Sequence, residues 1–144
     1  MASLRIMDEY YWMMLRQLEL SVSKRLGEAG LRGLGEGLRL YGRYRGESLR
    51  QNARTCAEGR DAMSLVRAWD VADLMLAQSD GRLEVEGDAS CATVRLARVP
   101  GSDYLTTPEG GALLAGYWRE TLAGLAAGYD EALSVSYPDF PADP

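Results

Sequence analysis

Histidine is absent from this sequence of 144 residues, and only two cysteines are present. The lack of histidine excludes Ser-His-Asp and Cys-His catalytic arrangements and removes a common zinc ligand. Cys56 and Cys91 lie far apart, and the sequence shows no secretory signal, so we expect two reduced thiols and no disulfide. These features predict a cytoplasmic protein without a zinc site.

Long hydrophobic runs and an excess of positive charge are also missing. The longest apolar stretches, such as residues 113–118, are much shorter than the ~20 residues that a membrane span needs. The net charge of -5 and the pI of about 4.8 argue against nucleic-acid binding, which needs a concentrated positive face. Phosphate-loop and dinucleotide-binding motifs are absent as well. We therefore expect neither a membrane nor a nucleic acid as partner.

Helical periodicity is what the sequence does contain. Hydrophobic residues recur at steps of three and four residues along most of the chain, and the glycine-rich residues 27–30 interrupt the first periodic stretch. Pro108 suits the first turn of a last helix. We expect about four helices, at residues 4–22, 31–49, 61–78 and 108–127.

A change to alternating periodicity at residues 83–96 predicts a small antiparallel β-hairpin with one wet face, turning at residues 87–90. A further short strand is expected at residues 135–137, followed by a proline-rich tail at residues 138–144. The length and the hydrophobic content of 47% suit one core. The sequence thus predicts a single, mostly helical α+β domain over residues 1–137.

Three glycines, Gly33, Gly35 and Gly37, alternate along the second predicted helix. Each interior glycine costs a helix about 0.5–1 kcal/mol relative to alanine. Packing must offset this cost, so we expect a neighbouring helix to approach closely along this stretch.

The arginine-rich segment 41–47 is the most distinctive feature of the sequence. On a helix, Arg43 and Glu47 are four residues apart and can form an ion pair that holds the guanidinium group in place. Because a fixed guanidinium suits a carboxylate ligand, Arg43, Arg45 and the adjacent Tyr41 are candidate substrate-binding residues. The alternative is a solvated, salt-bridged helix face.

Two further segments can carry chemistry. Cys91 is expected at the start of the second hairpin strand, where its thiolate can act as nucleophile or base, unless the residue is a small buried hydrophobe. On the last helix, Tyr117 and Glu120 share one face, beside Trp118. An aromatic wall would raise the pKa of Glu120, although core packing with Glu120 at its edge explains the same residues.

The segments 24–30 and 41–47, read together, resemble the L-2-amino-thiazoline-4-carboxylic acid hydrolase family of small bacterial proteins. The stretch from Leu83 to Cys91 is similar, more loosely, to the strand of that family that leads to a cysteine. Tyr117 and the pair at residues 128–129 are similar to its later helix and the turn that follows.

The resemblance implies a cofactor-independent reaction at the C=N bond of a small cyclic amidine that bears a carboxylate. It implies Arg43 or Arg45 as the clamp for the carboxylate, Glu120 or Glu47 as the acid–base group, and Cys91 as the nucleophile or second acid. The expected partner is a small-molecule substrate, with a second copy of the chain as a further candidate.

Two other functions stay open at this point. One is a cyclase or dehydratase that tailors a natural product, for which a pocket lined by aromatic residues would be typical. The other is a non-catalytic domain that binds a ligand or a partner protein.

Overall fold

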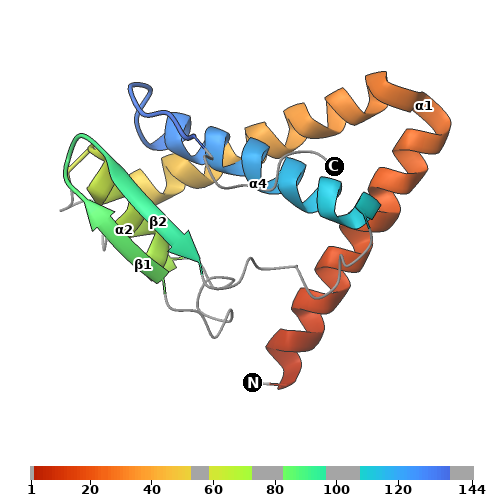
Figure 1. Ribbon diagram of the computed structural model, residues 1–144, viewed down its shortest axis with the longest axis horizontal. Coiled ribbons are helices and arrows are strands. Elements are labelled where there is room, and N and C mark those ends of the chain that lie inside the picture. The colour runs from red at the N-terminus through yellow and green to blue at the C-terminus, as the bar shows by residue number, and fades with distance from the viewer. Residues whose placement is uncertain (1, 53–58, 73–82, 97–107, 137–144) are drawn as a thin grey trace.

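One long, bent helix dominates the molecule. The computed structural model describes residues 2–52, 59–72, 83–96 and 108–136 (Figure 1). Helix α1 spans Ala2–Gln51 and bends at Gly27, where φ is 58° and ψ is -148°. Glycine adopts this positive φ readily because it has no Cβ atom. We call residues 2–26 the N-terminal arm and residues 28–51 the C-terminal arm of α1.

The predicted helices are found, but their number differs from the prediction. The break expected at residues 27–30 is a bend inside α1, so the described part of the chain holds three helical elements instead of four. Helix α2 spans Ala62–Ala72, one residue after its predicted start, and residues 73–78 of its predicted range lie outside the described residues. Helix α4 spans Pro108–Tyr129 and begins at the predicted proline. None of the described helices combines the length and the apolar content that crossing a bilayer requires.

Helix α4 packs along the C-terminal arm of α1 (Figure 1), and two pairs of glycines form the contact. Gly42 and Gly46 of α1 face Gly124 and Gly128 of α4. A Cβ atom at Gly42 would overlap the carbonyl oxygen of Thr121, and one at Gly124 would lie 2.8 Å from the backbone nitrogen of Arg43. The two helices therefore meet backbone against backbone.

The close approach predicted at Gly33, Gly35 and Gly37 is wrong for two of these residues. A Cβ atom at Gly33 or Gly37 would meet nothing within 4 Å, and one at Gly35 would meet only the side chain of Glu120, at 3.7 Å. The glycines that do allow close approach lie further along the helix, within the arginine-rich segment. The reason is that α4 crosses the C-terminal arm along its other face.

The core is centred on aromatic side chains from three helices. Trp12 of the N-terminal arm lies 4.9 Å from Tyr117, centroid to centroid, at an interplanar angle of 75°. Trp69 of α2 lies 6.4 Å from Trp118 at 63°. Such edge-to-face pairs are the favoured aromatic geometry. They hold the N-terminal arm and α2 against α4. The other buried members of this cluster are Leu15, Leu49, Leu65, Ala68, Leu125, Ala126 and Tyr129.

The predicted hairpin is confirmed. Strand β1 spans Leu83–Gly87 and pairs antiparallel with β2, Ala92–Leu96, in a two-stranded sheet that packs beside α2 (Figure 1). Val94 and Leu96 pack against the core, while Thr93 and Arg95, which alternate with them, are exposed. One face of the hairpin is therefore solvated, as expected.

The predicted strand at residues 135–137 is wrong for the two positions that the structure describes, because Val135 and Ser136 have no strand conformation. A turn after α4 precedes them. Asp130 holds this turn by accepting hydrogen bonds from the backbone N–H groups of Ala132 and Leu133, at 2.9 and 3.0 Å. The paired strands in the described residues are β1 and β2 alone. Tyr137 and the proline-rich tail lie outside the described residues.

Candidate functional site

An open groove of about 470 Å³ lies between the two arms of α1 and the middle of α4. Leu31, Leu34 and Leu38 provide apolar lining, and polar groups come from each of the three segments. Its volume falls in the range of small-molecule sites. The polar and charged lining residues are Glu19, Arg32, Glu36, Arg39, Tyr117 and Glu120.

The central polar contact of the groove joins α1 to α4. Arg39 Nε donates a hydrogen bond to Glu120 Oε2 at 2.8 Å, which makes a charge-assisted ion pair. The arginine side chain is the more exposed partner. A guanidinium group has further N–H donors on its two terminal nitrogens, and these can bind a planar carboxylate.

Glu19 brings a different kind of carboxyl group to the groove from the N-terminal arm. Burial raises the pKa of Glu19, because a poorly hydrated site disfavours the charged form. Among the described residues it forms no ion pair that would offset this effect. Glu19 is thus the lining residue most suited to exchange a proton.

Tyr117 closes one side of the groove. It is buried, and its hydroxyl oxygen lies 2.9 Å from that of Tyr11 on the N-terminal arm. The structure therefore brings two of the sequence-predicted residues, Tyr117 and Glu120, to one groove. Trp118 is one position further along, about 100° around the helix, and its side chain is buried in the aromatic core instead.

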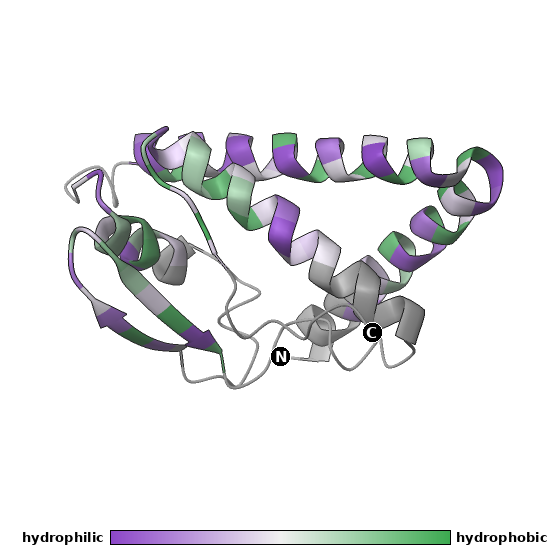
Figure 2. Ribbon diagram, turned by 45° about the horizontal axis from the view of Figure 1, so that its top comes forward, coloured by the Kyte–Doolittle hydropathy of each residue, from purple (hydrophilic) through white to green (hydrophobic). Residues whose placement is uncertain are grey.

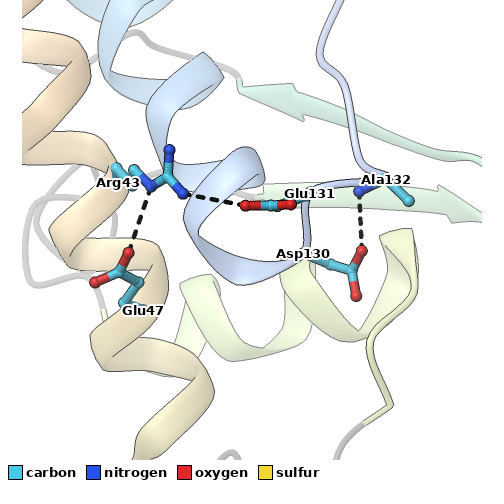
Figure 3. Close-up of polar contacts among 5 residues, drawn as sticks. All are labelled: Arg43, Glu47, Asp130, Glu131 and Ala132. Carbon is cyan, nitrogen blue, oxygen red and sulfur yellow. Dashed lines mark hydrogen bonds and ion pairs between the residues drawn. The ribbon is translucent and has the colours of Figure 1, made fainter.

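Arg43 and Glu47 form the predicted ion pair, but away from the groove. Figure 3 shows Arg43 Nε donating to Glu47 Oε1 at 3.4 Å, and Arg43 Nη2 donating to Glu131 Oε1 at 3.2 Å. Glu131 follows the C-terminal end of α4, whereas the groove lies at the middle of this helix. The pair of contacts ties that end of α4 to α1.

The remaining candidates also lie outside the groove. Tyr41 is largely exposed and Arg45 is half-buried on the C-terminal arm, and neither residue lines it. Cys91 is exposed in the hairpin turn. In Figures 1 and 2 the hairpin and the bend of α1 are at opposite ends of the molecule. The structure thus does not bring Cys91 to Glu120.

The turn around Cys91 has a structural explanation of its own. Asp88 Oδ1 accepts hydrogen bonds from the backbone N–H groups of Ser90 and Cys91, at 2.8 and 3.2 Å. The Ser90 hydroxyl group donates to the same oxygen at 2.6 Å. This hydrogen bond and the two from the backbone hold the pKa of Asp88 below its ordinary value, because they stabilise the carboxylate. Gly87, with φ of 128°, completes the turn.

Sequence reasoning missed Glu19 and Arg39. Glu19 does leave a signal, because Trp12, Leu15, Glu19 and Val22 follow one another at helical steps. A carboxylate in such an apolar stripe indicates a buried acid. Arg39 leaves no comparable signal, since its importance comes from Glu120 on a different helix.

No group of three or more potential metal ligands occurs within the described ranges of the chain. No family model, curated protein or solved structure matches this chain. The functional argument therefore depends on the groove itself.

Proposed function

We propose that the protein is a cofactor-independent enzyme that binds a small carboxylate with an apolar body in this groove and acts on it by proton transfer. The observation that carries the proposal is Glu19. Its carboxyl group has a raised pKa and lines the same groove as the ion pair of Arg39 and Glu120. A carboxyl group with a shifted pKa and an ion-paired arginine in one concave site are typical of acid–base catalysis.

The charged and the apolar residues of the groove would bind different parts of the ligand. The terminal nitrogens of Arg39 bind the ligand carboxylate, while Glu120 holds the guanidinium in position through Nε. Leu31 and Leu38 cover the apolar body of the ligand. Apolar burial of this kind contributes about 25 cal/mol per Å².

A carboxyl group with a raised pKa can act as an acid towards a ligand in the same groove. With a cyclic amidine as substrate, Glu19 in its acid form gives its proton to the ring nitrogen. A water molecule adds to the carbon of the C=N bond, and the resulting carboxylate accepts a proton from that water. The nitrogen gains hydrogen, the carbon gains a hydroxyl group, and Glu19 returns to its starting state. This is the reaction type that the family resemblance implies, with water in the place of the Cys91 thiolate.

Turnover of L-2-amino-thiazoline-4-carboxylic acid and related cyclic amidine carboxylates tests the proposal, with mass spectrometry to detect a product heavier by one water. Glu19→Gln should lower kcat by about 10²-fold or more, because the proton donor is lost. Arg39→Gln should chiefly raise KM. Glu28→Gln is the matched control for Glu19, since its side chain is 94% exposed on the same helix. It should leave both constants unchanged.

Two results would contradict this function. Full turnover by Glu19→Gln would remove Glu19 from the reaction. Binding of these carboxylates without turnover, measured by calorimetry and weakened by Arg39→Gln, would instead make the groove the site of a non-catalytic binding domain.

The raised pKa of Glu19 can also be tested by stability. Below the unfolded-state pKa of glutamate, about 4.3, the residue is protonated in both states and burial costs nothing. As the pH rises through the folded-state pKa, ionisation of this half-buried carboxyl group lowers the free energy of unfolding. Glu19→Gln should therefore be more stable than the wild type at pH 7, and this advantage should shrink towards pH 4. Urea titrations measure the free energy of unfolding of both proteins at each pH. If the difference between them does not change with pH, burial of the Glu19 charge is not the cause of that difference.

A further inference from the structure

The outer face of the C-terminal arm is apolar and exposed. Gly33, Gly37, Leu40 and Tyr44 follow one another at steps of four, three and four residues, so they lie in one line along the helix. Leu40 is 68% exposed and Tyr44 is 67% exposed. Figure 2 shows apolar and polar residues alternating along this arm. Large exposed apolar side chains arranged along one face are typical of an interaction surface.

We propose that this outer face binds the same face of a second copy of the chain, in an antiparallel dimer with two-fold symmetry. Along this line the two glycines come first in the sequence, and the two large residues follow them. Antiparallel pairing therefore places Gly33 opposite the partner's Tyr44 and Gly37 opposite the partner's Leu40. Each large side chain meets a position without a side chain, and a two-fold axis repeats both contacts.

Space for the large side chains is present at both glycines. A Cβ atom at Gly33 or Gly37 would meet nothing within 4 Å. The dimer gives these residues the close helix approach that α4 provides for Gly42 and Gly46 on the inner face. It also explains why the helix retains two residues that each cost about 0.5–1 kcal/mol.

The charges beside the outer face support the antiparallel register. On one flank, the register that pairs Gly37 with the partner's Leu40 brings Glu36 next to the partner's Arg43. Symmetry makes this two ion pairs. Within the described residues Glu36 forms no ion pair inside its own chain. Arg43 already contacts two carboxylates of its own chain, so Glu36 of the partner subunit would be a third carboxylate beside this guanidinium.

On the other flank of the outer face the antiparallel register makes an apolar contact instead of an ion pair. There the same register brings Leu34 next to the partner's Tyr41, so that two apolar side chains meet. A parallel dimer would instead set Glu36 beside the partner's Tyr41 and Arg43 beside the partner's Ser48. The antiparallel arrangement is thus the one that matches both flanks.

Sedimentation of the full chain over a concentration series tests the dimer. We expect a reversible dimer, and Tyr44→Glu should weaken it by tenfold or more because two carboxylates would enter the apolar contact. The matched control is Tyr10→Glu on the N-terminal arm, since Tyr10 is also 67% exposed. It should leave the dimer intact. A wild-type chain that stays monomeric throughout, or a dimer that Tyr10→Glu disrupts and Tyr44→Glu does not, would overturn the proposal.

A charge exchange tests the register independently of the apolar contact. Glu36→Arg and Arg43→Glu should each weaken the dimer, because each brings like charges together. The double variant should restore dimerisation towards the wild-type level, with circular dichroism showing that all three variants are folded. A double variant that is weaker than either single variant would contradict the antiparallel register.

Discussion

The C-terminal arm of α1 carries two pairs of glycines with the same four-residue spacing on different faces. The inner pair, Gly42 and Gly46, lies against the backbone of α4, where an added Cβ atom would overlap carbonyl oxygens. The outer pair, Gly33 and Gly37, has open space around it. Glycine spacing alone therefore does not identify a helix contact, because the stabilisation that a glycine allows depends on the element that faces it.

The largest expected effect on stability comes from adding a methyl group at either glycine of the inner pair. Gly46→Ala should lower the free energy of unfolding by about 1–3 kcal/mol or more, since overpacking is costly and the overlapping atoms belong to the backbone of α4. Gly42→Ala should behave in the same way. Urea denaturation measures both. Wild-type stability in either variant would show that α4 can move away from α1 at little cost.

A smaller effect is expected from a hydrogen bond beside the inner pair. Tyr129 is buried next to Gly46, and its hydroxyl group donates to the carbonyl oxygen of Gly59 at 2.8 Å. Tyr129→Phe should cost about 1 kcal/mol, because it leaves this carbonyl without its donor. Tyr10→Phe, at an exposed position, is the control and should be neutral in the same denaturation experiment.

Adding a methyl group at the outer pair should have the opposite effect on stability and raise the free energy of unfolding. Gly33→Ala and Gly37→Ala should each stabilise the chain by about 0.5–1 kcal/mol, since alanine favours the helix and its methyl group meets nothing. Unfolding must be measured at concentrations low enough to keep the chain monomeric. Destabilisation in that range would mean that the outer face is already packed within one chain.

The smallest effect is expected where charges join the same two helices. Arg43→Gln should change the stability by about 0–1 kcal/mol, because its two ion pairs are exposed and the Glu131 side chain is 86% exposed. The loss should also decrease in high salt. A loss as large as that of Gly46→Ala would show that charge, and not close backbone packing, holds α4 to α1.

Much of the fold could be predicted from the sequence, because its signals are local. Glycine at the bend, proline at the start of α4 and the alternation of residues 83–96 each act over a few neighbouring residues. The prediction was wrong where it needed information from another element. The four expected helices become three elements because the backbone is non-helical at Gly27 alone, and the second arm of α1 begins directly after this kink.

The candidate site was predicted only in part, for the same reason. Tyr117 and Glu120 share a helix face, and both line the groove. Arg43 and Glu47 do pair with one another, yet they do so at the end of α4. Glu19 and Arg39 join Glu120 from separate segments of α1. Helical spacing within one segment could not show that these three side chains line one groove.

Local periodicity and turn residues specify backbone conformation, so the sequence alone predicted the helical segments, the hairpin and the interruption at residues 27–30. The tertiary structure alone decided which glycines meet a helix and which carboxyl groups share a groove. Both outcomes depend on the angle of α1 at Gly27 and on the line along which α4 crosses it. These are set by packing between residues far apart in the chain, so the chemistry of Glu19 and Glu120 emerges only in the folded molecule.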